Sequence, residues 1–139
     1  MSAFTLTDAL IIINGVTLSD HANEVTVEDN RDAPDFTAFG ATSKAVGKGL
    51  GDASIKVKMF QDFASGKTHA TLQPLIGSTT GVVIEVRATS AARSATNPAA
   101  LMTGLLFNYN MLAGGIGSPS MIDAEFKNAS QSGMTYPTA

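Results

Sequence analysis

Alternating apolar and polar residues predict that this chain is mostly β. From Ala53 to Met59 every second residue is apolar, and the residues between them include Lys56 and Lys58. A period of two places one face of a strand against a core and the other in solvent. The same pattern predicts four further strands: Glu24–Asn30, Gly81–Ala88, Ala100–Leu112 and Ser120–Asn128.

The N-terminal part predicts a hairpin. Ala9–Ile13 is a continuous apolar run of strand length, and Asn14-Gly15 follows it directly. This dipeptide readily adopts the positive φ angles of a tight hairpin turn. We therefore expect Val16–Leu18 to return as a short strand.

One segment changes to a helical period. Thr68–Ile76 carries apolar residues three and four positions apart, which form one stripe on a helix. Pro74 and Gly77 should keep this helix short. We expect the helix to cover an open end of the β structure through Leu72, Leu75 and Ile76.

The alternation in the two C-terminal strands predicts which side chains share a face. Gly104 is expected to mark a bulge or a bend in the longer strand. The large side chains of that strand should share one face: Leu101, Thr103, Leu105, Phe107, Tyr109 and Met111. In the last strand the inward residues should be Ile122, Ala124 and Phe126.

The chain is expected to form one domain, 1–139, with flexible ends at 1–8 and 129–139. At 139 residues a single domain can bury a substantial core. The last segment is polar, so it should need no place in that core.

Gly40–Gly51 is glycine-rich and has no periodicity. Unstructured loops of about a dozen residues are uncommon in compact domains and are usually functional or ordered by a partner. Phe36 and Phe39, just before this loop, are available for packing. We therefore predict a subunit contact made by Phe36, Phe39, Val46, Gly47, Lys48, Gly49 and Leu50.

Charge and composition exclude several classes of function. The net charge of −3 supplies no basic footprint for nucleic acid, and the absence of cysteine removes disulfide and thiolate chemistry. No apolar run approaches the roughly 20 residues that a membrane-spanning helix needs. These features favour a protein that is made in the cytoplasm and binds no membrane.

No motif indicates catalysis, and we predict no catalytic, cofactor or metal site. His21 and His69 lack a partner at a metal-ligand spacing. Gly66-Lys67-Thr68 has the ending of a phosphate-binding loop, but Gln61 stands where the first glycine would be needed. Asp123 and Glu125 alternate on one outward face, which is more typical of solvated charges than of a glycosidase pair.

Several segments, in their order along the chain, resemble the major tail tube proteins of long-tailed, non-contractile bacteriophages and their prophages. Together they span most of the chain from Ile11 to Phe126. The segments are Ile13-Asn14-Gly15-Val16-Thr17-Leu18-Ser19-Asp20-His21, Asp35-Phe36-Thr37-Ala38-Phe39-Gly40, Val57-Lys58-Met59-Phe60-Gln61-Asp62-Phe63, Thr71-Leu72-Gln73-Pro74-Leu75-Ile76-Gly77 and Glu85-Val86-Arg87-Ala88-Thr89-Ser90-Ala91.

This resemblance implies a β-sandwich of barrel-forming sheets with one short flanking helix. It further implies hexameric rings stacked into a virion tail tube, contacts with other tail proteins, and DNA that passes through the lumen without specific binding. On that basis Glu85, Asp123 and Glu125 are candidates for the lumen. The alternatives are a minor tail, tail-terminator or capsid-decoration protein, a free-standing binding module, and an enzyme with a convergent carboxylate site.

Overall fold

The computed structural model describes residues 3–139, so Met1 and Ser2 of the expected flexible N-terminus lie outside the described part. The chain is mostly β, as predicted, with one short helix. The elements in order are β1 (Leu10–Ile13), β2 (Val16–Thr17), β3 (Ala22–Arg31), β4 (Gly51–Phe60), α1 (Thr68–Leu72), the 3-10 helix η1 (Gln73–Leu75), β5 (Val82–Arg87), β6 (Ala99–Tyr109) and β7 (Met121–Asn128).

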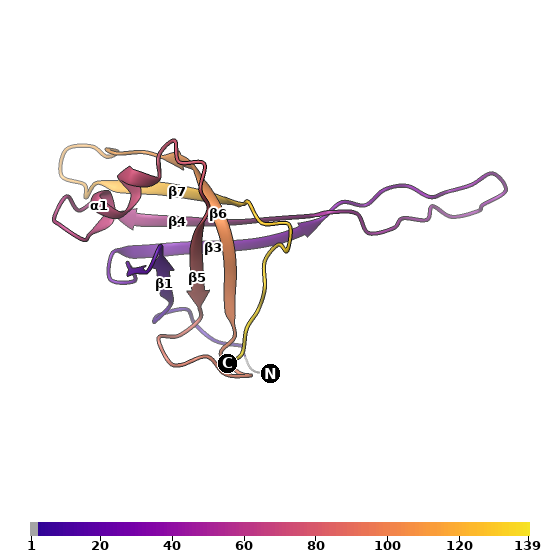
Figure 1. Cartoon of the computed structure of the whole chain (residues 1–139), viewed down its shortest axis with the longest axis horizontal. Helices are drawn as coiled ribbons and strands as arrows, with labels where there is room; N and C mark the ends of the chain where they lie inside the picture. Colours follow the sequence, from indigo (N-terminus) through magenta and orange to yellow (C-terminus); the bar gives the residue numbers. More distant parts are fainter. Residues whose placement is uncertain (1–2) are drawn as a thin grey trace.

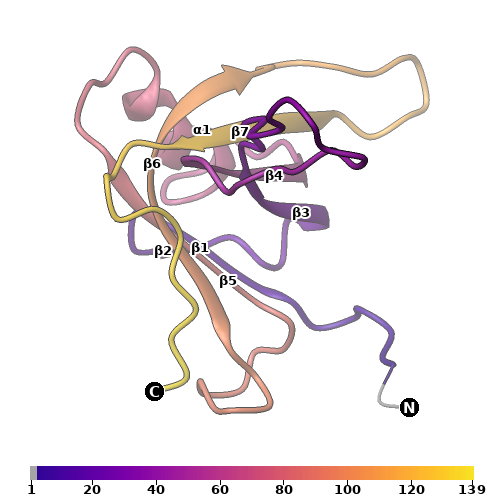
Figure 2. The ribbon, with the colours of Figure 1, turned by 90° about the vertical axis from the view of Figure 1, so that its right-hand side faces the viewer.

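The seven strands form one antiparallel sheet in the order β2-β1-β5-β6-β7-β4-β3. The sheet folds over itself, so that β1 and β5 run crosswise to β3, β4 and β7 (Figure 1, Figure 2). Strand β6 joins the two layers, because its first part pairs with β5 and its second part pairs with β7. A sandwich therefore forms from a single continuous sheet.

Gly104 lies where β6 passes from one layer to the other. It pairs with Val82 of β5 on one side and Asn128 of β7 on the other. A Cβ atom at this position would come within 2.8 Å of the Lys127 carbonyl oxygen, so the crossing needs glycine. The register shift of β6 falls later, between Leu106 and Asn108.

The core lies between the two layers and confirms the inward face predicted for β7. Ile122, Ala124 and Phe126 are buried there with Ile55 and Met59 of β4. For β6 the expectation that the large side chains share one face is wrong, because Tyr109 packs against the core whereas Phe107 is 63% exposed. Met102 is buried in the core, and Leu106 packs against it. Leucines occur on both faces of β6, so the alternation alone does not identify the buried one.

The predicted hairpin at the N-terminus is present. Asn14 and Gly15 both have positive φ, at 51° and 81°, and Ile13 pairs with Val16 across the turn. Asparagine and glycine tolerate this conformation better than other residues. The turn therefore positions β2 at one edge of the sheet.

The helical segment covers one end of the sandwich. Leu72 and Leu75 are buried, as predicted, and the Thr68 hydroxyl donates to the Phe60 carbonyl at 3.1 Å. The prediction for Ile76 is wrong, because its side chain is exposed. Its backbone is extended (φ −67°, ψ 123°), so Ile76 has already left the helix and its apolar stripe.

The C-terminal segment contacts the sheet, contrary to the expectation that it needs no place in the core. Met134 is buried in the core cluster, and Thr135 and Leu101 exchange two backbone hydrogen bonds of 2.9 Å. The Tyr136 hydroxyl donates to Asp29 Oδ2 at 2.7 Å. Met134 and these hydrogen bonds attach the polar C-terminal segment to the sandwich.

Candidate assembly surfaces

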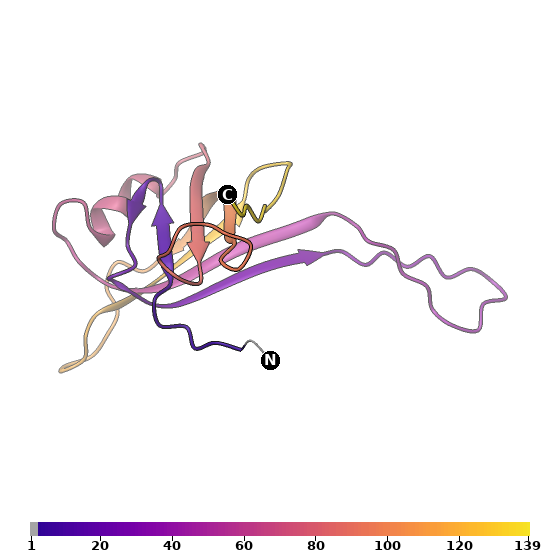
Figure 3. The ribbon, with the colours of Figure 1, turned by 90° about the horizontal axis from the view of Figure 1, so that it is seen from below.

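Beyond the sandwich, β3 and β4 continue into a long arm made of residues 32–50 (Figure 1, Figure 3). Backbone hydrogen bonds join its two sides, from Asp32 N to the Leu50 carbonyl at 3.0 Å and from Phe36 N to the Ala45 carbonyl at 2.8 Å. Asp35 and Val46 form an isolated bridge. The segment predicted as an aperiodic loop is therefore one side of a hairpin.

The arm exposes large apolar side chains far from the core. Phe36, Val46 and Leu50 are mostly exposed, and Phe39, next to the tip, is 110% exposed. Sequence reasoning expected Phe36 and Phe39 to be available for packing, and within the described chain neither joins the core. Exposed apolar surface is typical of interaction sites, so the arm is a candidate for a subunit contact.

Two glycines shape the arm. A Cβ atom at Gly47 would lie 2.3 Å from Cε2 of Phe36, so the phenyl ring rests directly on this glycine. A Cβ atom at Gly49 would lie 2.8 Å from the Asp32 Cβ. The structure therefore brings Phe36, Val46 and Gly47 together, while Leu50 lies at the root of the arm and Phe39 near its tip.

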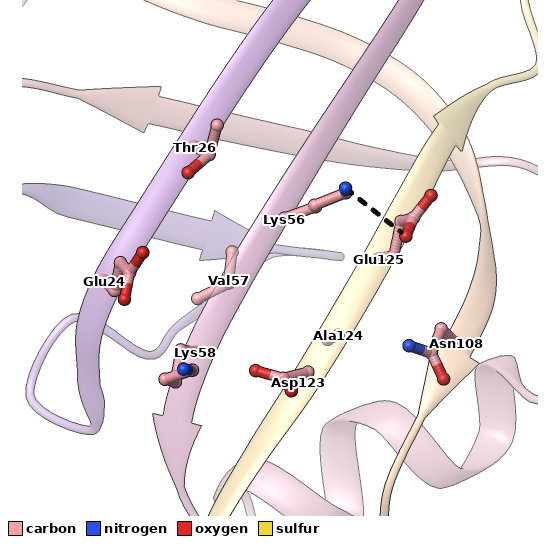
Figure 4. A pocket seen from close by; sticks show the side chains of 9 residues that line it. All are labelled: Glu24, Thr26, Lys56, Val57, Lys58, Asn108, Asp123, Ala124 and Glu125. Carbon is pink, nitrogen blue, oxygen red and sulfur yellow. Dashed lines mark ion pairs between the residues drawn. The ribbon is translucent and has the colours of Figure 1, made fainter.

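The outward side of β3, β4 and β7 carries a charged face, defined here by four carboxylates and three lysines: Glu24, Glu28, Asp123, Glu125, Lys56, Lys58 and Lys127. Acidic and basic residues alternate across the strands. Lys58 lies between Glu24 and Asp123 in the sheet register. Lys56 Nζ and Lys127 Nζ both approach Glu125, at 4.0 and 3.9 Å. A hollow of about 330 Å³ lies over part of this face, and Figure 4 shows the side chains that line it.

The three carboxylates considered for the lumen do not lie together. Asp123 and Glu125 share the charged face, whereas Glu85 lies on β5, beyond β6. Glu85 is buried and pairs with Arg87 and Arg93. The hydrogen bond from Arg93, with a further one from Arg87, holds the pKa of the Glu85 carboxyl below its ordinary value despite burial.

The layer formed by β3, β4, β7 and the second part of β6 has two open sides. β3 is the last strand of the sheet, and the residues of β6 after Gly104 pair with β7 alone among the described strands. Unpaired strand edges present backbone donors and acceptors to another chain. Periodicity predicted the strands but not which of them would be edges.

The β6–β7 loop is a second exposed apolar surface that sequence reasoning missed. Leu112 and Ile116 are exposed in it. Because Phe60 pairs with Met121, this loop lies at the end of the layer opposite the arm. The signal was present in the sequence, since Ile116 stands between two glycines, as Leu50 does between Gly49 and Gly51.

Within residues 3–139, no group of three or more histidine, cysteine or acidic residues could hold a metal ion. In that same span no helix is long and apolar enough to cross a membrane. The candidate surfaces for association are the arm, the two strand edges, the charged face and the β6–β7 loop.

Comparison with solved structures identifies the fold. The tail of an empty gene transfer agent particle with C6 symmetry matches 97% of this chain and 99% of its own, with 12% identity and a TM-score of 0.76. The SPP1 tail tube matches 95% of this chain and 77% of its own, with 10% identity and a TM-score of 0.73. The sheath-tube complex of an extracellular contractile injection system matches 99% and 93%, with 10% identity and a TM-score of 0.69.

No protein-family model and no curated protein sequence matches the chain. The likeness is therefore one of architecture. The chain has the fold found in the tail and tube proteins of these particles, over nearly its whole length.

Proposed function

We propose that this chain is the structural subunit of a phage-type tail tube. Six copies close into a ring, and the rings stack into a conduit for DNA in the virion tail. The chain is made in the host cytoplasm and has no catalytic role. The observation that carries this proposal is the four-strand layer with an open edge on each side, in a fold shared with tail tubes.

The direction of the strands supports ring closure. β3, β4, β7 and β6 alternate in direction across the layer. Because the layer has four strands of alternating direction, its two outer strands, β3 and β6, run in opposite directions. When copies are related by rotation about an axis parallel to the strands, β6 of one copy is therefore antiparallel to β3 of the next. Each copy then pairs both of its open edges, and a closed barrel leaves no edge exposed.

The charged face lines the lumen in this proposal, with Asp123 and Glu125 facing the DNA. Tight DNA binding needs lysines and arginines that are free to replace counterions. Here the lysines lie beside carboxylates, which also repel phosphates. DNA can therefore slide along this wall. Glu85 takes an internal role, holding Arg87 and Arg93.

The arm connects rings. It projects from one end of the layer, and the β6–β7 loop lies at the other end. We assign the arm as the contact with the next ring and Leu112 and Ile116 as part of its acceptor. A contact between two different surfaces of the same chain repeats without closing, which produces a filament.

Negative-stain electron microscopy of the purified chain tests the proposal. Hollow tubes of uniform width are expected. Isolated rings would favour the alternative of a tail-terminator, minor tail or capsid-decoration protein, and monomers at every concentration would favour a free-standing binding module. A variant in which Asn-Gly replaces residues 33–49 should fold and form single rings, and normal tubes from it would overturn the role of the arm.

A further inference from the structure

His21 lies between two carboxylates that come from different parts of the chain. Its Nδ1 atom is 2.8 Å from Asp20 Oδ1, and its Nε2 atom is 2.8 Å from Asp62 Oδ2. The His21 side chain is only 15% exposed. Asp20 belongs to the turn before β3, whereas Asp62 follows β4. The imidazole therefore joins the beginning of β3 to the segment that leads into α1.

Both contacts require a particular protonation state. An ionised carboxylate only accepts hydrogen bonds, and a neutral imidazole has a single N–H donor. Two contacts to two ionised carboxylates therefore need the doubly protonated imidazolium. If the ring loses one proton, one nitrogen lone pair faces a carboxylate and that contact is lost.

The surroundings favour this charged state. The charged groups that act on the ring are Asp20 from the turn before β3 and Asp62 from the segment after β4. Lys67, before α1, interacts with both carboxylates. The hydrogen bond that the ring donates to Asp20 and, next in effect, the one to Asp62 raise the pKa of His21 above its ordinary 6.5. Asp62 is itself held in place, since its Oδ1 accepts the Ala64 N–H at 2.9 Å.

The cluster lies where the open edge of β3 begins. The His21 carbonyl accepts the Phe60 N–H at 2.8 Å, and the next residue, Ala22, starts β3. The register of β3 against β4 shifts between Ala22 and Glu24. A groove of about 460 Å³ runs beside this stretch, between the N-terminal segment and Asn23, Glu24 and Val25. The position of His21 therefore affects the shape of the first part of the edge.

We propose that His21, paired with Asp20 and Asp62, is a positioning residue. It holds the start of the β3 edge in the shape that allows a second copy of this chain to pair with it. Assembly weakens when the imidazole gives up its second proton. The effect on assembly rests on the proposed function above. The contacts of His21 with Asp20 and Asp62, called the clamp here, lie within a single chain. The stabilisation is complete below about pH 6.5 and is lost as the pH rises through the raised pKa of the imidazole. Hydrogen bonds from His21 to Asp20, and from the Ala64 N–H and His21 to Asp62, hold the pKa values of both carboxyls below the ordinary 3.8. The stabilisation is therefore lost again only as the pH falls through these lowered values.

Titration of the imidazole by NMR tests the clamp without any assembly. The chain has two histidines, so His69→Gln assigns the two sets of signals. The His21 midpoint should lie above 6.5 and should move back toward 6.5 in Asp62→Asn. A midpoint at or below 6.5, or one that Asp62→Asn leaves in place, would overturn the proposal.

Sedimentation of assembled material between about pH 6 and about pH 9 tests the consequence. The wild-type yield should fall by about threefold or more over this range. His21→Gln, which does not titrate, should give a flat profile, and His69→Gln should keep the wild-type profile. The same fall in His21→Gln would overturn the positioning role. If no variant assembles at any pH, the tube function fails while the NMR titration still decides the clamp.

Discussion

The ring of Phe36 rests on Gly47, across the two sides of the arm. A Cβ atom at position 47 would lie 2.3 Å from Phe36 Cε2, closer than two unbonded carbon atoms can approach. Gly47 does not have a positive φ, so its backbone tolerates other residues. The glycine is therefore needed for the position of Phe36 and not for the conformation of the chain.

Gly47→Ala should displace the Phe36 ring and reduce tube formation. The displaced Phe36 ring is free to move into solvent, so the free energy of unfolding should change by no more than about 0.5 kcal/mol. Chemical denaturation and electron microscopy measure the two effects. Thr79→Ala, in the exposed segment before β5, is the control and should alter neither. Normal tubes from Gly47→Ala would show that Phe36 is not part of the interface between subunits.

Phe39→Ser should abolish stacking without weakening the fold. The side chain is fully exposed, so its removal costs the single chain less than about 0.5 kcal/mol. Phe126→Ala is the contrasting variant, because Phe126 is completely buried and its loss should cost about 3–5 kcal/mol. Thermal unfolding and sedimentation separate the two cases. Equal destabilisation by both changes would mean that Phe39 packs within its own chain.

Much of this architecture was readable from the sequence, because strand periodicity and turn residues are local signals. The strand at Ala53–Met59 and the turn at Asn14-Gly15 are examples. The buried face of β6 was not predictable, since leucines occupy both faces. The arm appeared aperiodic because both of its sides are exposed, so no burial imposes alternation on Gly40–Gly51. Which strands form edges depends on long-range pairing, which no local pattern records.

Met134→Ala should destabilise the single chain by about 2 kcal/mol, because it leaves a cavity where the C-terminal segment joins the core. Thr138→Ala, on an exposed residue of the same segment, is the matched control. Thermal unfolding is the measurement. If Met134→Ala unfolds at the wild-type temperature, the C-terminal segment does not pack on β6 in solution.

Glu85→Gln should destabilise the chain by about 2 kcal/mol near neutral pH, since Arg87 and Arg93 lose their ionised partner. The pKa of Glu85 is lowered in the fold, so its contribution is present above the ordinary value of 4.5 and is lost as the pH falls through the lowered value. Urea unfolding should therefore show the difference between wild type and variant shrinking below about pH 4.5. A difference that stays constant down to about pH 2 would contradict the ion-pair role.

The proposed ring requires neighbouring copies to pair β3 with the second part of β6, and engineered cysteines test this pairing most directly. The chain has no cysteine of its own. Thr26→Cys is combined in turn with Leu105→Cys, Phe107→Cys and Asn108→Cys, to sample the register of pairing. Within one copy β4 and β7 separate these positions by about 14 Å, too far for a disulfide.

Any cross-link must therefore join two copies. Oxidation of the assembled double variants should give, in at least one register, a ladder of covalent species on a denaturing gel that ends at six chains. Tubes that form normally but yield no cross-link in any of the three registers would contradict ring closure through these two edges.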